Sequence, residues 1–221
     1  MPLAEEPHPA SIATSPAGPR VLVAYDSRYG STAEVGNAIG ATLAQRRARV
    51  EVRHVETIDG IAAYDRVIVG AAIRYERWMP GAADFVRKHR RELAATPVAM
   101  FFTCLALSQP DRARETVAGY ERKIRSIAPE IVPISIKGFA GVLDYSRMTP
   151  MTRRFARLLL MLRGADAGDH RNWIEITAWA EGLDREAANL IETVSAVELD
   201  HPTEAGQYVT RQSEAFDDHG D

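Results

Sequence analysis

The residues of this 221-residue chain that are best suited to chemistry lie between Asp26 and Thr32, in the stretch DSRYGST. It supplies hydroxyl groups from Ser27, Ser31 and Thr32 around one glycine, Gly30. Hydroxyl and backbone N–H donors that converge at the start of a helix bind phosphate oxygens, which the positive end of the helix dipole also attracts. A glycine lets the backbone approach such a ligand closely. The stretch is therefore a candidate phosphate site.

The flanking segments predict the local structure that this site needs. Residues 21–24 are a short apolar run, typical of a strand that is buried on both faces. From residue 33 onward the apolar positions follow a helical spacing, with Val35, Ile39 and Leu43 on one face. A buried strand should thus lead into the polar loop, and the loop should open a helix.

Two common phosphate-binding motifs do not match this loop. A P-loop requires a lysine that does not follow Gly30, and the spacing of Gly30, Gly36 and Gly40 differs from a dinucleotide fingerprint. The remaining pattern resembles the flavodoxin loop that holds the phosphate of FMN, with Tyr29 where that family often has Thr and Ser31 where it often has Asn. The alternative is an ordinary helix cap without a ligand, because Ser and Thr are common capping residues.

Strand-like and helical segments alternate through the body of the chain. Further strands are predicted at residues 50–55, 66–70 and 131–141 and in the first part of 97–107, and helices at 33–46, 81–93, 111–127 and 177–193. Strands that are separated by helices form a parallel, doubly wound α/β sheet. Five strands with a phosphate loop after the first fit the flavodoxin-like order 2-1-3-4-5.

In such a sheet the ligand lies beyond the carboxyl ends of the strands. The third predicted strand leads into residues 70–78, where Tyr75 and Trp78 either stack on a flavin or anchor the loop by packing. The fourth leads into residues 103–108, whose backbone N–H groups could face the flavin edge. Within it, Cys104 is interpreted as a small buried residue rather than as a nucleophile.

Residues 143–173 form a long insertion between the fifth strand and the last helix. Its apolar residues follow a helical spacing and are surrounded by arginines: Met151, Phe155, Leu158, Leu159 and Leu162, with Arg147, Arg153, Arg154, Arg157 and Arg163. A basic amphipathic helix is typical of a membrane-surface or partner-binding element, and its arginines would also suit a substrate with carboxylates. The alternative is a helix that packs against the sheet edge with solvated arginines.

Composition limits the function further. Residues 1–19 contain two acids and five prolines, and residues 197–221 contain seven acids against one arginine, so both termini are predicted to be disordered. Because the whole chain has a net charge of −3, the body at 20–196 carries about +5, unlike the acidic flavodoxins that shuttle electrons.

One cysteine and no signal peptide or spanning segment indicate a cytoplasmic protein. The histidines are scattered along the chain, which argues against a metal site. The arginines alternate with Leu and Met rather than with exposed aromatic residues, which argues against nucleic-acid binding.

Residues 20–195 resemble the menaquinone-dependent protoporphyrinogen IX dehydrogenase family, which has a flavodoxin-like fold. The shared features are YDRVIVGAAIRY at 64–75, FVRKHRREL at 85–93, the insertion with its arginine-rich helix at 151–163, and the approach to the last helix at 171–179. The combination of the Ile-Arg-Tyr loop with the insertion is more specific than the phosphate loop, which many flavodoxins share. The chain departs from the family pattern at Cys104 and at Tyr29.

The resemblance implies an FMN-dependent enzyme that oxidises protoporphyrinogen IX to protoporphyrin IX, with a membrane quinone as electron acceptor and the inner face of the membrane as a peripheral docking surface. It implies that the FMN phosphate is held by Ser27, Tyr29, Gly30, Ser31 and Thr32. The isoalloxazine would lie between Ala71, Ala72, Ile73, Arg74 and Tyr75 on one side and Thr103, Cys104, Leu105 and Ala106 on the other. Membrane or substrate contacts would come from Arg153, Arg154, Phe155 and Arg157. No side chain stands out as a catalytic base.

Three other interpretations stay open from the sequence. The chain could be a flavodoxin-type electron-transfer protein, an FMN reductase that acts on another substrate, or an interaction module that kept the fold without a flavin. The insertion helix could also pair with its copy in a homo-oligomer in place of a membrane.

Overall fold

The computed structural model describes residues 18–108, 110–143, 154 and 168–199. The chain divides into two compact units, Met1–Leu183 and Asp184–Asp221. The first unit contains the sheet and every candidate site residue that the structure describes. In the second unit the described residues continue helix α6, which ends at Leu199.

A six-stranded sheet forms the centre of the first unit. Its parallel strands lie in the order β2-β1-β3-β5-β6, and β4 pairs antiparallel with β3 outside this path. The strands are β1 (Arg20–Asp26), β2 (Arg49–His54), β3 (Arg66–Arg74), β4 (Arg77–Trp78), β5 (Val98–Cys104) and β6 (Ser135–Ala140). The flavodoxin-like doubly wound sheet is therefore confirmed, and the five parallel strands lie across the sheet in the expected order. The prediction of five strands missed β4.

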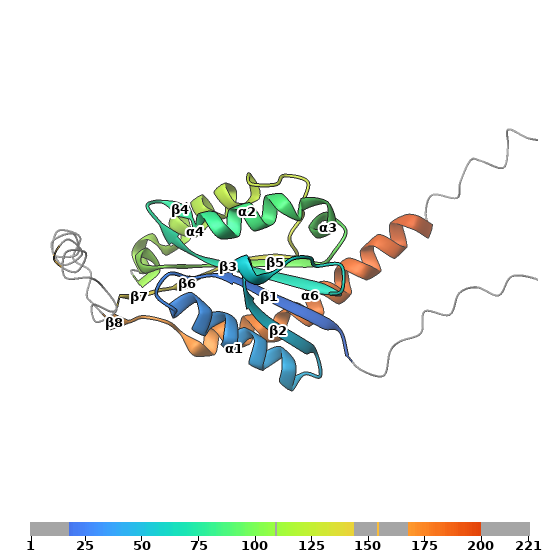
Figure 1. Cartoon of the computed structure of the whole chain (residues 1–221), viewed down its shortest axis with the longest axis horizontal. Coiled ribbons are helices and arrows are strands. Elements are labelled where there is room, and N and C mark those ends of the chain that lie inside the picture. Colours follow the sequence, from blue (N-terminus) through green and yellow to red (C-terminus); the bar gives the residue numbers. More distant parts are fainter. Residues whose placement is uncertain (1–17, 109, 144–153, 155–167, 200–221) are drawn as a thin grey trace, which may run out of the picture. The chain divides into compact units, whose positions relative to one another are not determined.

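Helices cover both faces of the sheet (Figure 1). One face carries α1 (Ser31–Gln45) and the first part of α6 (Trp173–Leu199), whose buried residues include Ile39 and Ile176. The other face carries α2 (Pro80–Lys88), α3 (Arg90–Ala94) and α4 (Pro110–Arg125), which bury Phe85, Leu93 and Ile124. Short 3-10 turns follow β2 at Val55–Thr57 and β5 at Leu105–Ser108. Every residue of β5 is buried, as expected for a strand covered on both faces.

Several predicted boundaries were wrong for identifiable reasons. The strand predicted at 131–141 begins only at Ser135, because Pro133 has no N–H with which to join the ladder. The helix predicted at 81–93 is two helices, α2 and α3, which meet at His89. The last helix begins at Trp173 rather than at residue 177, whereas the strand predicted in the first part of 97–107 is β5, which ends at Cys104 close to the expected loop.

The long insertion leaves and returns at one place, beyond the carboxyl end of β6. A second, two-stranded sheet pairs β7 (Val142–Leu143) with β8 (Gly168–Asp169), in the register Val142↔Asp169 and Leu143↔Gly168. Between these strands the structure describes Arg154, which is helical and exposed. Arg153, Phe155 and Arg157 lie outside the described residues. Among the helices that the structure describes, none is long and apolar enough to span a membrane.

Candidate functional site

The loop between β1 and α1 has the features of an anion site. Gly30 takes a left-handed backbone conformation (φ 88°) that other residues rarely adopt, and its N–H donates to Ser27 Oγ at 3.1 Å. Helix α1 begins at Ser31, and its N-cap residue is Gly30, which has no side chain with which to cap the first turn. The interpretation of Ser31 and Thr32 as ordinary capping residues therefore finds no support. N–H groups in the first turn that no side chain caps can instead donate to a phosphate.

A buried hydrogen bond connects this loop with the end of β5. Thr32 Oγ1 and Thr103 Oγ1 are 2.9 Å apart, and both residues are almost fully buried. Two segments that the sequence assigned to one site are thus in direct contact. The same bond means that the Thr32 hydroxyl already has a protein partner, so Ser27 and Ser31 are the better candidates for direct contact with a phosphate.

The third predicted strand extends further than its sequence pattern suggested. Ala71, Ala72, Ile73 and Arg74 belong to β3 itself and not to a loop, which corrects the prediction for this segment. Strands β3 and β4 are joined by a two-residue turn, Tyr75 and Glu76, with φ values of 48° and 59°. Tyr75 is 81% exposed, whereas Trp78 is buried in the core. Of the two aromatic residues that could stack on a flavin, only Tyr75 presents its ring to solvent.

Cys104 lies at the end of β5 in a buried, polar corner. Burial is the main cause that raises the pKa of the Cys104 thiol, so the neutral form is favoured. Next to it, the Tyr120 hydroxyl donates to Glu76 Oε2 at 2.6 Å. Burial and then this hydrogen bond raise the pKa of Tyr120 well above its usual range. A protonated cysteine beside a protonated tyrosine fits the interpretation of Cys104 as a packing residue. Beyond it, Leu105 is half-buried and Ala106 exposed in the turn that follows.

Arg171 is a site residue that the sequence did not single out. Its side chain is only 7% exposed and lies between two acids: Nη2 is 2.6 Å from Asp169 Oδ2, and Nη1 is 2.7 Å from Glu34 Oε2. Nη1 also donates to the carbonyl oxygen of Ser31 at 3.2 Å. The hydrogen bond from Arg171 lowers the pKa of Asp169. Arg171 therefore joins the end of the insertion to the first turn of α1, which belongs to the candidate anion site.

Asp26 is a second residue that sequence reasoning left without a role. It is buried, and its Oδ2 accepts a hydrogen bond from the backbone N–H of Ala82 at 3.2 Å in the first turn of α2. A Cβ on Gly81 would lie 2.6 Å from the same oxygen, so this close approach requires glycine. Its other oxygen is 3.7 Å from His54 Nε2. Asp26 thus fixes α2 to β1, and the contacts that the structure describes for its carboxylate are with Ala82 and His54 rather than with the β1–α1 loop.

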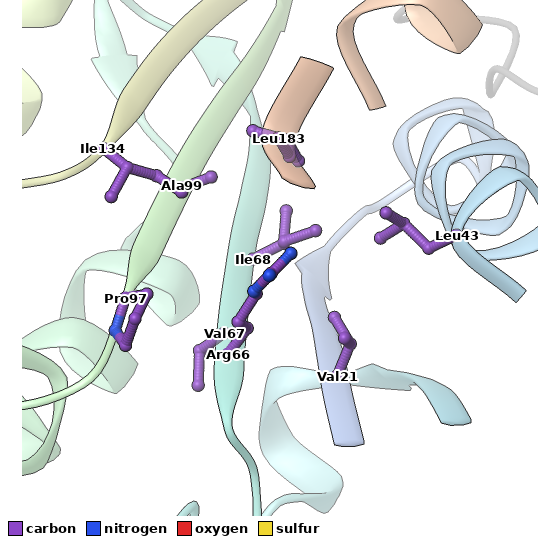
Figure 2. A pocket seen from close by; sticks show the side chains of 9 residues that line it. All are labelled: Val21, Leu43, Arg66, Val67, Ile68, Pro97, Ala99, Ile134 and Leu183. Atoms are coloured by element: carbon purple, nitrogen blue, oxygen red, sulfur yellow. The ribbon is translucent and has the colours of Figure 1, made fainter. Parts of the chain in front are cut away.

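A small cavity in the same unit is not a candidate for cofactor binding. Its volume is about 10 Å³, which is roughly the space of one water molecule. Figure 2 shows that it lies among residues at the starts of β1, β3 and β5, at the edge of the sheet opposite the β1–α1 loop. Its lining is apolar apart from Arg66: Val21, Leu43, Val67, Ile68, Pro97, Ala99, Ile134 and Leu183.

Comparison with known families fixes the family of this chain. The model described as "Flavodoxin domain" matches residues 22–168, which include the β1–α1 loop and the ends of β3 and β5. The chain belongs to the flavodoxin domain family. This membership indicates a flavin cofactor, and the uncapped start of α1 with its hydroxyl groups fits the phosphate of such a group.

Curated relatives confirm the resemblance that the sequence motifs predicted. A protein of Escherichia coli strain K12 named protoporphyrinogen IX dehydrogenase [quinone] is 27% identical over 177 residues, which are 78% of this chain and 97% of the relative. A protein of Leishmania major with the same name is 30% identical over 170 residues, 73% of this chain and 71% of the relative. Oxidised flavodoxin 2 from Bacillus cereus superposes with a TM-score of 0.42 and 25% identity, over 55% of this chain and 85% of that chain.

Proposed function

We propose that the flavodoxin domain of this chain binds FMN at the carboxyl edge of its sheet. The first-turn N–H groups of α1, with the hydroxyls of Ser27 and Ser31 and the backbone at Gly30, would hold the phosphate. The isoalloxazine would lie between the end of β3, at residues 71–75, and the end of β5, at residues 103–106. The support is the left-handed glycine at the start of an uncapped helix, together with family membership.

We further propose that the chain oxidises protoporphyrinogen IX to protoporphyrin IX and passes the electrons to a quinone. The observation that carries this proposal is the match over 97% of the length of the E. coli relative, which bears that name. The quinone would be reached from a membrane surface, which makes peripheral association part of the proposal.

FMN, when bound, accepts the hydrogen equivalents that leave the substrate and returns them to the acceptor. The residues of the chain position this group and control its surroundings. Ala72 has a small side chain and lets a flat ring approach the end of β3, whereas Ala71 is fully buried in the core. The bond between Thr32 and Thr103 joins the first turn of α1 to the end of β5 and so fixes their separation. Cys104 keeps its proton because of burial, so it adds no negative charge beside the ring.

An anaerobic assay with the full chain tests this proposal. The protein is loaded with FMN and mixed with protoporphyrinogen IX, and the visible absorption of the flavin is followed before and after addition of menaquinone in vesicles. Bleaching by the substrate and recovery with the quinone are the expected results. Binding of FMN without bleaching would refute the porphyrinogen assignment and favour an electron carrier or a reductase for another substrate.

A pair of glycine variants tests the location of the phosphate. Gly30→Ala places a Cβ on a left-handed residue, and we expect it to weaken FMN binding by about tenfold or more because the loop must rearrange. Gly60→Ala is the matched control, since a Cβ there meets nothing within 4 Å. Equal FMN affinity of the two variants by fluorescence titration would place the phosphate elsewhere.

A further inference from the structure

Two arginines and two tyrosines gather at the rim of the proposed flavin site. The Cζ atoms of Arg28 and Arg74 lie 5.8 and 5.9 Å from the centroid of the same ring, that of Tyr29. Arg74 is also 5.0 Å from the ring of Tyr75, and its Nη2 donates to the Tyr75 hydroxyl at 3.3 Å. These residues come from the β1–α1 loop and from the β3–β4 hairpin, so the fold brings distant segments into one cluster.

The two guanidinium groups of this cluster have no acidic partner among the residues that the structure describes. No carboxylate of that part of the chain lies within ion-pair distance of Arg28 or Arg74. Arg171, at the same edge of the sheet, is by contrast paired with two carboxylates. Charged arginines that are held against aromatic rings but lack a counter-charge are suited to bind an anionic ligand.

The backbone around Arg74 is held in place at an energetic cost. Tyr75 and Glu76 occupy left-handed conformations at both positions of a turn where Asn and Gly are usual. The turn is fixed to α4 by the hydrogen bond from Tyr120 to Glu76 and by a bond from Lys123 Nζ to the Glu76 carbonyl oxygen at 3.1 Å. Strained turns that neighbouring elements stabilise are common at ligand sites. This arrangement presents Arg74 and the exposed Tyr75 together at the rim.

We propose that Arg28 and Arg74 bind the carboxylate groups of the substrate, with the rings of Tyr29 and Tyr75 as apolar walls. The inference rests on the proposed function, because protoporphyrinogen carries two propionate side chains on an apolar macrocycle. The two arginines could pair with the two propionates, and the tyrosine rings beside them could contact the apolar macrocycle. The resemblance had offered the arginines of the insertion as membrane or substrate contacts, and of these the structure describes only Arg154.

The dimethyl ester of the porphyrin isolates the role of the carboxylates, because it keeps the macrocycle and removes both charges. Binding of protoporphyrin IX and of its dimethyl ester is measured by fluorescence titration in detergent with the FMN-loaded wild type, Arg28→Gln, Arg74→Gln and the control Arg91→Gln. Arg91 is exposed on α3 and loses the same charge outside the cluster. We expect the wild type and Arg91→Gln to prefer the diacid by about tenfold or more, and Arg74→Gln to lose most of this preference. The ester should bind alike to all four proteins.

The outcomes separate this inference from the proposed function. Equal binding of diacid and diester by the wild type would overturn the carboxylate site, whether or not the flavin is reduced. If Arg28→Gln and Arg74→Gln keep the preference for the diacid over the diester but bind FMN more weakly, the carboxylate site would be overturned. The two arginines would then be assigned to the FMN phosphate. If Arg74→Gln loses the preference for the diacid but protoporphyrinogen does not reduce the flavin of the wild type, the carboxylate site would be supported and the proposed enzyme activity refuted.

Discussion

The buried bond between Thr32 and Thr103 gives the sharpest prediction about the site. Replacing either threonine by valine keeps the shape of the side chain but removes one hydroxyl, which leaves the other hydroxyl without a partner. Both residues are at most 4% exposed, so water cannot replace the lost bond. Leaving a buried hydroxyl unsatisfied costs about 1–3 kcal/mol, so each single variant should lose that much free energy of unfolding. In urea this shifts the unfolding midpoint by about 1 M.

The double variant Thr32→Val with Thr103→Val distinguishes a shared bond from two separate effects. Because neither hydroxyl remains to be satisfied, we expect the double variant to lose little more stability than one single variant, with a coupling energy of about 1 kcal/mol or more. Thr42→Val in the same helix is the control, since Thr42 donates to the Ala38 carbonyl within α1 and its loss leaves no buried group without a partner. Urea unfolding of the apoprotein measures all four variants. Strictly additive losses would refute the reasoning.

Three further predictions concern the surroundings of the site. Arg171 lowers the pKa of Asp169, so the pair adds stability at neutral pH. This stability is lost as the pH falls from about 4, the ordinary pKa of aspartate, through the lowered pKa of Asp169. Asp169→Asn should therefore be less stable than the wild type in urea at pH 7, and the two proteins should differ little in acid. Gly70→Ala should lose about 1–3 kcal/mol in thermal unfolding, because its Cβ would overlap the Phe101 ring; an unchanged midpoint would contradict this packing. Tyr120→Phe should raise proteolytic cleavage at the β3–β4 turn, and equal cleavage would show that the bond does not hold it.

The parts of the fold with strong local patterns were predictable from the sequence. The apolar run at 21–24 and the helical spacing after it located β1, the loop and α1, and the order of the parallel strands followed from their alternation with helices. Strand β4 was not predictable, because it has two residues and its turn consists of Tyr75 and Glu76 rather than Asn and Gly. The end of β3 was read as a loop for the same reason.

The contacts between distant segments were beyond the reach of sequence patterns. Arg171 meets Glu34 across 137 positions, and Thr32 meets Thr103 across 71. Nothing in the local composition around these residues indicates the partner, since the topology of the sheet brings them together. The loop residues of the candidate site were assigned from motifs, whereas the residues that fix those loops became visible only in three dimensions.

Reduction of the bound flavin by the substrate is the measurement that tests the central claim most directly. The FMN-loaded chain is mixed anaerobically with one third of an equivalent of protoporphyrinogen IX in a stopped-flow instrument, because the full oxidation releases six electrons and each FMN accepts two. Flavin absorption and porphyrin fluorescence are recorded together. The account predicts that flavin absorption falls from the first two-electron step onward, and that porphyrin fluorescence rises as the third step completes the oxidation, with about three FMN reduced per porphyrin formed. Persistent flavin absorption in the presence of substrate, with FMN firmly bound, would contradict it.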